Sequence, residues 1–292
     1  MARLDIEDVA HSYVAGADRK DWALQPLRLT LEDSRTYALV GPSGCGKTTL
    51  LNVLSGLVTP TQGRVRFDGV DVTELPTKAR NIAQVFQFPV IYNSMTVYEN
   101  LAFPLQGRRW DKARIDAKVH TVAEALGLEH RLRQPARRLT ADDKQLISLG
   151  RGLVRDDVAA LLMDEPLTVI DPQLKFSLRR KIREISEQFQ PTVIYVTHDQ
   201  YEAMSFAQEL LVMKGEVVFV EISGSETFVH LTVGDAPFVV QIEGIHDVGL
   251  GETVMMRLRP ERLFAFDPAG QLVRAPESGP TSIPAARTEV GG

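Results

Sequence analysis

Short apolar runs, separated by longer segments with helical spacing, are the main pattern in the N-terminal two thirds of the chain. Runs this short and without alternation are typical of parallel strands that are buried on both faces. Leu27, Leu29 and Leu31 instead alternate with polar residues, which indicates a half-buried antiparallel strand. Because helical patterns separate the buried runs, we expect an α/β domain with a mixed sheet at its core. The four buried runs are 37–40, 82–86, 159–163 and 192–197.

Two helices have clear boundaries in the sequence. Asp171 is a good N-cap, and Pro172 suits the first helical position of the longer one. A second helical stretch, 113–126, ends at Gly127, a residue that commonly closes helices. The apolar residues of the longer helix recur at helical spacing and form a stripe along one face, which predicts core packing without a functional role. It consists of Leu174, Leu178, Ile182, Ile185 and Phe189.

The pattern changes in the last quarter of the chain. Lys214-Gly215 suggests a hairpin turn, and short strand-like runs with turn signals between them follow it. From Pro276 onward the chain is rich in Pro, Gly, Ser, Thr and Ala, which favours disorder. We therefore expect a main α/β domain over 1–220, a small β-rich module over 221–275, and a disordered tail over 276–292.

Composition narrows the possible functions. The 292 residues are 44% hydrophobic and 24% charged, with a formal net charge of -5, so there is no basic excess for nucleic acid. The single cysteine, Cys45, excludes an internal disulfide and fits a reducing compartment. No apolar run approaches the length that spans a bilayer, and residues 1–5 do not resemble a signal peptide. We therefore expect any membrane connection to run through a partner.

The segment Gly41-Pro42-Ser43-Gly44-Cys45-Gly46-Lys47-Thr48 fits the pattern of a phosphate-binding loop, with a strand before it and a helix after it. Its glycines let backbone N–H groups converge on phosphate oxygens, and the helix N-terminus adds positive charge. Lys47 would reach the β- and γ-phosphates, and the Thr48 hydroxyl would ligate Mg²⁺. An ordinary glycine-rich turn is the alternative, and the flanking strand and helix disfavour it. The loop predicts binding of ATP or GTP.

A second candidate element lies at the end of the buried run 159–163. Asp164 would hold Mg²⁺ there, directly or through water, and Glu165 would polarise the attacking water. The alternative is a pair of acids that merely marks the exit of a strand into solvent. The phosphate loop earlier in the chain favours the catalytic interpretation.

Further segments follow in a set order: Val85-Phe86-Gln87, Met95 to Asn100, Leu167 to Asp171, and Val196 to Gln200. With the two elements above, the chain resembles the ATPase subunit of an ABC transporter of the carbohydrate-importer class over nearly its whole length. The resemblance implies a P-loop NTPase fold with a helical subdomain at about 88–155. It also implies Mg²⁺ and ATP as cofactors.

The resemblance assigns a role to each matching position. Gln87 would touch Mg²⁺ and the nucleophilic water, Glu165 would be the catalytic glutamate, and His198 would contact the γ-phosphate. Asp171 would lie at the seam of an ATPase dimer. Tyr13 falls where an aromatic stacks on adenine, although it could simply cap a strand. The residues implied to bind nucleotide around the loop are Gly41, Pro42, Ser43, Gly44, Cys45, Gly46, Lys47, Thr48 and Thr49.

One segment departs from the family. Where members usually carry Leu-Ser-Gly-Gly-Gln, this chain has Leu139-Thr140-Ala141-Asp142-Asp143, here called the signature segment. The two glycines that let backbone approach a partner's γ-phosphate are replaced. A carboxylate at about 4 Å from such a charge, at an effective dielectric near 20, is repelled by about 4 kcal/mol. The alternative is that Asp142 and Asp143 only cap the following helix.

The departure predicts a heterodimer with a second ATPase that has an intact signature segment. Two membrane-spanning permease subunits and, indirectly, a periplasmic substrate-binding protein are the other implied partners, at the cytoplasmic face of the inner membrane. The altered segment, with 148–153 behind it, is similar to one ATPase of the two-ATPase glycerol importer of proteobacteria. Import of glycerol 3-phosphate or a sugar, and a regulatory subunit that binds ATP without hydrolysis, stay open.

The C-terminal module is shorter than in most importer ATPases of this class. Residues 257–262 resemble the closing motif of the family's regulatory domain, whereas its first part is shortened. In the groove that would receive a permease helix, the apolar residues could equally be core. They are Phe88, Pro89, Ile91, Tyr92 and Met95.

Overall fold

The structure is a computed structural model that describes residues 2–107, 110–168, 170–198, 202–204, 207–233, 236–251, 253–258, 265–266 and 272–274. The expected tail, 276–292, and residues 259–262 of the closing motif lie outside these ranges, as does the side chain of Leu174. Among the described residues, no helix is long and apolar enough to cross a membrane.

The core of the molecule is an eight-stranded sheet with the strand order β11-β10-β9-β3-β8-β7-β6, in which β12 also pairs with β9. The four predicted parallel strands are confirmed, because β3 pairs in parallel with β8, β8 with β7 and β7 with β6. Their side chains are almost all buried, as the unbroken apolar runs indicate. The bounds are β3 Thr36–Val40, β6 Ala83–Val85, β7 Leu161–Asp164 and β8 Val193–Val196.

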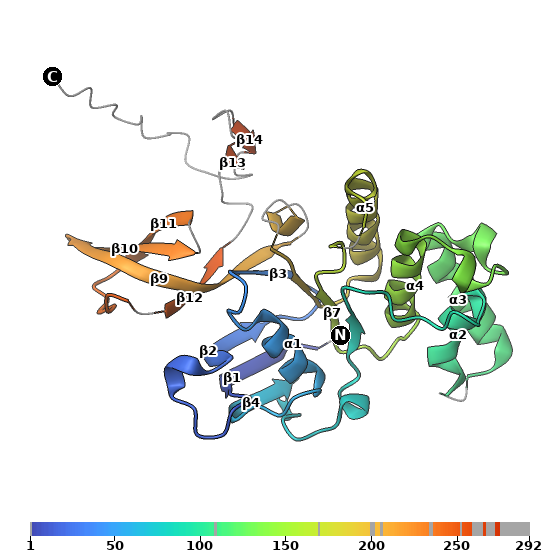
Figure 1. The fold of residues 1–292 in the computed structure, drawn as a ribbon, viewed down its shortest axis with the longest axis horizontal. Helices are drawn as coiled ribbons and strands as arrows, with labels where there is room; N and C mark the ends of the chain where they lie inside the picture. The colour runs from blue at the N-terminus through green and yellow to red at the C-terminus, as the bar shows by residue number, and fades with distance from the viewer. Residues whose placement is uncertain are drawn as a thin grey trace.

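A second, antiparallel sheet lies beside the first with the order β2-β1-β4-β5. It contains the predicted half-buried strand, in which Leu24, Leu27, Leu29 and Leu31 are buried. Helix α1, Lys47–Ser55, lies next to β1, β2 and β4 (Figure 1), and the four elements share one apolar core. The bounds are β1 Leu4–His11, β2 Leu24–Leu31, β4 Gln62–Phe67 and β5 Val70–Asp71, with 3-10 turns at Arg19–Asp21 and Thr77–Arg80.

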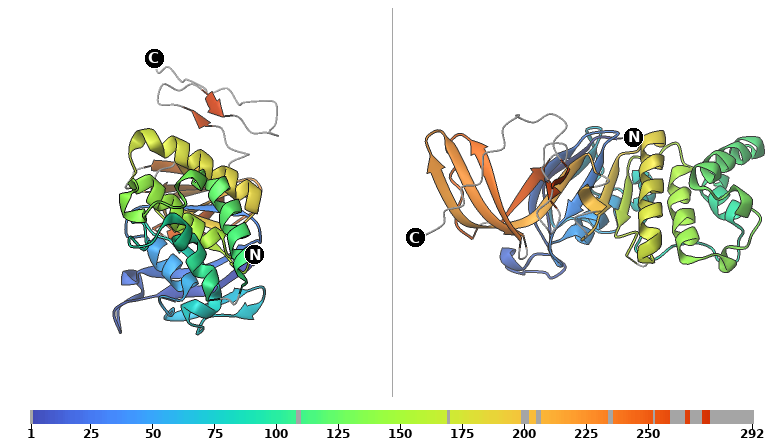
Figure 2. Two further views of the ribbon diagram at one scale, coloured as in Figure 1. Left: turned by 90° about the vertical axis from the view of Figure 1, so that its right-hand side faces the viewer. Right: turned by 90° about the horizontal axis from the view of Figure 1, so that it is seen from above.

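Helices α2, α3 and α4 form a separate group at the β6 end of the large sheet (Figures 1 and 2). Leu101, Val119 and Ile147 join them in one core, each fully buried. Thr96 and Glu99 start α2 with a reciprocal capping box, and Gly127 ends α3 in a left-handed conformation, as its sequence predicts. The bounds are α2 Val97–Gln106, α3 Lys112–Leu126, α4 Ala141–Leu153 and α5 Pro172–Phe189, with 3-10 turns at Glu129–Arg131 and Ala136–Arg138.

The C-terminal strands extend the large sheet at the end opposite to α2–α4 (Figure 2). The expected turn at Lys214-Gly215 is wrong: β9 runs through both residues, and Gly215 is opposite Val254 of β12. Pairing with β12 and with β10 keeps this part of β9 extended, and the turn comes later, at Gly224 with φ 63°. The bounds are β9 Glu209–Ser223, β10 Glu226–Val233, β11 Ala236–Glu243, β12 Thr253–Leu258, β13 Ala265–Phe266 and β14 Leu272–Arg274.

The expected domain boundary at residue 220 falls inside β9. A single core connects Ala38 and Val40 of β3 with Val229 and Leu231 of β10 and with Met256 of β12. The division into an ATPase domain and a β-rich module therefore stays a prediction, and the sheet itself continues across it.

Candidate active site

The predicted phosphate loop connects β3 to α1 and has a conformation that requires glycine. Gly46 precedes α1 with φ 100°, and a Cβ on it would lie 2.6 Å from the carbonyl oxygen of Ala23. A Cβ on Gly41 would lie 2.8 Å from the carbonyl oxygen of Met213 in β9. Ser43 and Gly44 are exposed at the tip. The base of the loop is therefore packed closely against the backbone of Ala23 and Met213, while its tip faces solvent.

Lys47 is folded back over the loop. Its Nζ donates to the carbonyl oxygens of Gly41 at 2.8 Å and Pro42 at 3.0 Å, and the residue is only 8% exposed. Two backbone dipoles thus hold the ammonium group beside the N-terminus of α1, where positive partial charge already accumulates. This arrangement is suited to an anion that replaces the carbonyl oxygens.

Thr48 and Asp164 bring a hydroxyl and a carboxylate together from α1 and β7. Thr48 Oγ1 donates to Asp164 Oδ1 at 3.5 Å. Partial burial raises the pKa of the Asp164 carboxyl, and the neighbouring Glu165 also raises it, while Thr48 and Lys47 lower it. A cation at this point would relieve the desolvation of the carboxylate.

The donor set fits Mg²⁺. Within the described ranges, no group of three or more His, Cys, Asp or Glu side chains is arranged to hold a metal. Mg²⁺ is commonly held by one or two protein oxygens with substrate phosphates and water as its other ligands. The Thr48 and Asp164 oxygens, next to a phosphate loop, match that pattern.

Glu165 and His198 meet at the ends of β7 and β8. His198 Nδ1 lies 3.4 Å from Glu165 Oε1, and Thr168 Oγ1 donates to Glu165 Oε2 at 3.2 Å. The backbone N–H of Glu165 donates to Val196 O at 3.0 Å, and Glu165 itself has φ 47°. A non-glycine residue rarely adopts this conformation, which is commoner at functional sites. Here it turns the chain at the end of β7 and places the carboxylate against His198.

Gln87 follows β6, which is next to β7 in the sheet. Because the carboxyl ends of parallel strands lie at one edge, Gln87 leaves the sheet on the same side as Asp164 and His198. Gln145 of α4, to which sequence reasoning gave no role, supports this segment: its Nε2 donates to Phe86 O at 3.0 Å, while its buried Oε1 has no hydrogen-bond partner among the described residues. The sequence signal for Gln145 was only its place just after the signature segment.

The signature segment leads into α4, which begins at Ala141. The alternative, that Asp142 and Asp143 cap the helix, is correct in placing both acids in its first turn. The N-cap itself is Thr140, whose hydroxyl accepts from the Asp143 N–H at 3.5 Å. Asp143 lies in the first turn, buried, where it pairs with Arg131 and accepts from Thr140 Oγ1 at 2.9 Å. Both acids therefore lie where the helix favours negative charge. Only Asp142, half-buried, has no such counter-charge among the interactions described.

Comparison with known proteins identifies the family. The sequence pattern of the family described as "ABC transporter" matches residues 24–168. An sn-glycerol-3-phosphate import ATP-binding protein, UgpC 3 of Rhizobium etli, is 37% identical over 289 residues, which cover 94% of this chain and 81% of that protein. The chain belongs to the ABC transporter ATP-binding proteins.

Other comparisons agree on the fold of this ABC ATPase. YurJ of Bacillus subtilis, an uncharacterized ABC transporter ATP-binding protein, is 40% identical over 218 residues, or 74% of this chain. The match spans 58% of the length of YurJ. The solved structure of cbiO1 from Clostridium perfringens, part of the transporter complex cbiONQ, has a TM-score of 0.65 and 25% identity and covers 72% of this chain and 83% of that one.

Two aromatic residues of the ABC ATPase are candidates for contact with the nucleoside. Tyr13 is 61% exposed, and its ring packs edge-on against His11 at 4.5 Å between centroids. Trp22, which sequence reasoning missed, lines a cavity of about 410 Å³ together with Gly44 and Cys45 of the loop. Stacking of Tyr13 on adenine stays a prediction. In the sequence, the only signal for Trp22 is that it comes shortly before the antiparallel strand. That position alone does not indicate a binding role.

The last predicted site residue is Asp171. It is exposed immediately before α5, and its carbonyl oxygen accepts from the Lys175 N–H at 3.0 Å. Exposure at a helix start is compatible with a place at a dimer seam, which stays a prediction. Asp199 and Gln200 of the His198 motif lie outside the described residues.

Proposed function

We propose that the chain binds and hydrolyses ATP and so powers an ABC importer. One observation carries the proposal: Lys47, Thr48, Asp164, Glu165 and His198 converge at the carboxyl edge of three adjacent strands, β3, β8 and β7. Each strand thus delivers one part of a phosphoryl-transfer site, and the rigid sheet fixes their spacing.

ATP would bind with its phosphates over the loop 41–46. Lys47 would exchange the carbonyl oxygens of Gly41 and Pro42 for β- and γ-phosphate oxygens, so its ammonium group stays solvated by oxygen throughout. Thr48 and Asp164 would hold Mg²⁺, which neutralises charge on the phosphates when it is bound. The backbone N–H groups at the start of α1 would bind the remaining phosphate oxygens.

Glu165 would accept the proton of the attacking water. At present its two oxygens contact His198 and Thr168, and each oxygen keeps a second lone pair that could accept from water. His198 would turn from Glu165 to contact the γ-phosphate. Gln87 would hold the same water and the metal from the neighbouring strand. This division gives the base and the phosphate contact to different strands.

The signature segment supports the proposal of a heterodimer. Ala141 and Asp142 replace residues that would have to approach a partner's γ-phosphate, and Asp142 adds a charge of the wrong sign. A second ATPase with an intact segment would complete the site on this chain's phosphate loop. This chain would complete only a degenerate site in return.

The remaining assignments follow from the family and the relatives. Two permease subunits and a periplasmic substrate-binding protein would form the rest of an importer at the cytoplasmic face of the inner membrane. Glycerol is our proposed cargo; the name of the Rhizobium etli relative supports a chemically related one, glycerol 3-phosphate. The ATPase site itself does not contact cargo, so cargo is decided by binding to the complete transporter.

The test measures phosphate release by this chain alone and with the candidate partner ATPase, for the native protein, Glu165→Gln and the exposed control Glu187→Gln. We expect turnover only in the mixed complex, and a loss of at least about a hundredfold for Glu165→Gln but not for the control. Brisk, Glu165-dependent turnover by the chain alone would contradict the heterodimer. A mixed complex that is insensitive to Glu165→Gln would favour the second candidate, a regulatory subunit that binds ATP without hydrolysis.

A further inference from the structure

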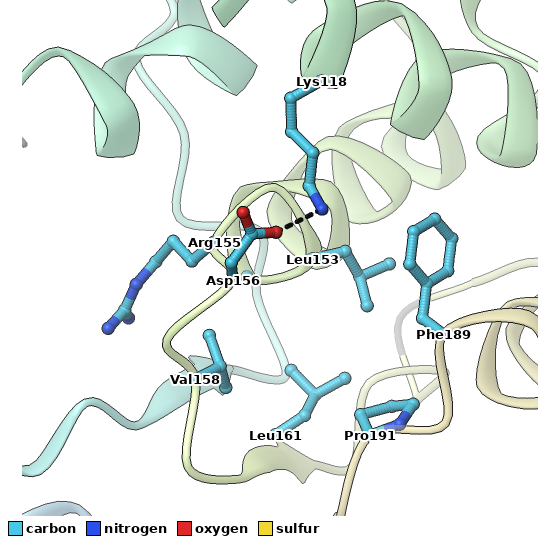
Figure 3. A pocket seen from close by; sticks show the side chains of 9 residues that line it. Lys118, Leu153, Arg155, Asp156, Val158, Leu161, Phe189 and Pro191 are labelled. Carbon is cyan, nitrogen blue, oxygen red and sulfur yellow. Dashed lines mark hydrogen bonds and ion pairs between the residues drawn. The ribbon is translucent and has the colours of Figure 1, made fainter. Parts of the chain in front are cut away.

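A cavity of about 160 Å³ lies at the edge of the sheet where β7 and β8 begin, opposite to the edge that carries the candidate active site. It is enclosed between α3, the end of α4 and these strand starts. Its walls are apolar: Leu153, Val158 and Leu161 are at most 7% exposed. Phe189 and Pro191, where α5 ends and the chain turns toward β8, close another side (Figure 3). Leu161 is the first residue of β7, whereas Asp164 at the active site is the last.

The entrance of the cavity is charged. Lys118 reaches from α3 toward the cavity (Figure 3), and its Nζ lies 2.5 Å from Asp156 Oδ1, while Arg114 Nη2 lies 3.3 Å from Asp156 Oδ2. Two cations therefore share one carboxylate, which leaves one net positive charge on the cluster of Lys118, Asp156 and Arg114 beside the cavity. Arg155, although it lines the cavity, directs its guanidinium to Asn81 and the carbonyl oxygen of Ile82. Its charge is balanced by Asp157, whose Oδ1 lies 3.4 Å from Arg155 Nε. The Lys118 side chain is 23% exposed, so part of the charge is desolvated.

The size and lining of the cavity define the ligand. A dry apolar cavity of about 150 Å³ is large enough to hold benzene. The excess positive charge at the entrance would pair with an anionic group attached to that apolar body. A ligand with an aromatic ring and a carboxylate joined by a short linker would satisfy both features. Its ring would lie against Leu153, Leu161 and Phe189, and its carboxylate would lie beside Lys118.

We propose that this cavity is a binding site for small carboxylates with an apolar body of about the size of a benzene ring. The carboxylate displaces Asp156 from Lys118, and the apolar body fills the space between α3 and the turn into β8. Bound in this way, the ligand connects the helical group α2–α4 to the sheet on the side away from the nucleotide.

Phenylacetate is the probe, titrated into the full chain by ligand-observed NMR with and without saturating ATP. We expect a dissociation constant of about 1 mM, as for a ligand of about ten heavy atoms, unchanged by ATP. Lys118→Met keeps most of the stem and removes the charge, so it should weaken binding about tenfold. Asp156→Asn removes the competitor for Lys118 and should tighten binding severalfold. Lys112→Met, an exposed lysine of the same helix, is the matched control and should leave the constant unchanged.

The opposite signs for Lys118→Met and Asp156→Asn are the decisive result, because a purely structural ion pair would make both variants weaker. Equal weakening by both, or an effect of Lys112→Met equal to that of Lys118→Met, overturns the proposal. So does the absence of binding at about 20 mM phenylacetate, well above the expected constant. Displacement of phenylacetate by ATP would place it in the nucleotide site and would also overturn the proposal.

Discussion

Replacement of Arg131 by methionine should destabilise the signature helix α4 through an uncompensated charge. Arg131 pairs with Asp143, whose side chain is 10% exposed, while its own is 33% exposed. The only other side-chain contact described for the Asp143 carboxylate is the hydroxyl of Thr140, at 2.9 Å. Arg131→Met therefore leaves a largely buried carboxylate with one neutral hydrogen bond in the first turn of the helix.

The magnitude follows from the exposure of the two partners. Loss of one member of a fully buried ion pair costs about 3–5 kcal/mol. Because Arg131 is one-third exposed and Thr140 stays in place, water and the hydroxyl recover part of this cost. We expect a loss of about 2 kcal/mol, which lowers the melting temperature of a domain of this size by about 5 °C.

Thermal unfolding of four proteins tests this expectation: the native chain, Arg131→Met, the double variant Arg131→Met with Asp143→Asn, and the exposed control Arg133→Met. The double variant removes the stranded charge and should recover most of the loss. The control should melt within about 1 °C of the native chain. Native-like melting of Arg131→Met would refute the reasoning, and a double variant as unstable as the single one would show that Arg131 acts through packing.

Three further predictions concern Asp164 and Cys45 of the candidate active site and His11, which packs against Tyr13. Asp164→Asn should abolish Mg²⁺-dependent phosphate release by the mixed complex. It should also raise the melting temperature of the nucleotide-free chain, because burial disfavours this carboxylate. Burial also lowers the pKa of His11, so on acidification the unfolded chain binds the proton before the folded chain does. The contribution of neutral His11 to the free energy of unfolding is therefore fully present above the unfolded pKa of about 6.5 and decreases as the pH falls. His11→Phe should make the free energy of unfolding, measured by urea titration, less dependent on pH between pH 5 and about 7.5. Alkylation of Cys45, which is 8% exposed and lies 3.8 Å from Lys47 Nζ, should block ATP binding, and bound ATP should slow the modification followed by mass spectrometry; modified protein that still binds ATP would contradict this.

The elements predicted most reliably from the sequence were those whose signal is local. The four short apolar runs became parallel strands because each is buried on both faces, which the composition of a few residues already records. The loop 41–46 needs glycine because its backbone adopts positive φ angles and because neighbouring backbone lies too close for a Cβ. The glycines in the sequence indicate both requirements. Gly127 ends α3 for the same conformational reason.

Features that depend on distant partners were not predictable in this way. Lys214-Gly215 looks like a turn by itself, but β10 and β12 pair with β9 there and keep it extended. Asp143 looks like a helix cap by itself, but Arg131, from the 3-10 turn Glu129–Arg131, neutralises it. In both cases the local preference was real, and a tertiary contact that no short window contains decided the outcome.

The continuity of the large sheet bears on how the C-terminal strands relate to ATP. Glu209, at the start of β9 and 1% exposed, pairs with Arg35 before β3 at 2.6 Å and with Arg257 of β12. Met213, further along β9, lies directly under Gly41 of the phosphate loop. A displacement of β12 would therefore act on β9 through the buried carboxylate of Glu209. A displacement of β9 would in turn move Met213 against Gly41, where there is no room even for a Cβ. Through β9, and through the core that β3 shares with β10 and β12, the C-terminal strands are thus packed against the elements that carry the phosphate loop, whether or not they form a separate module.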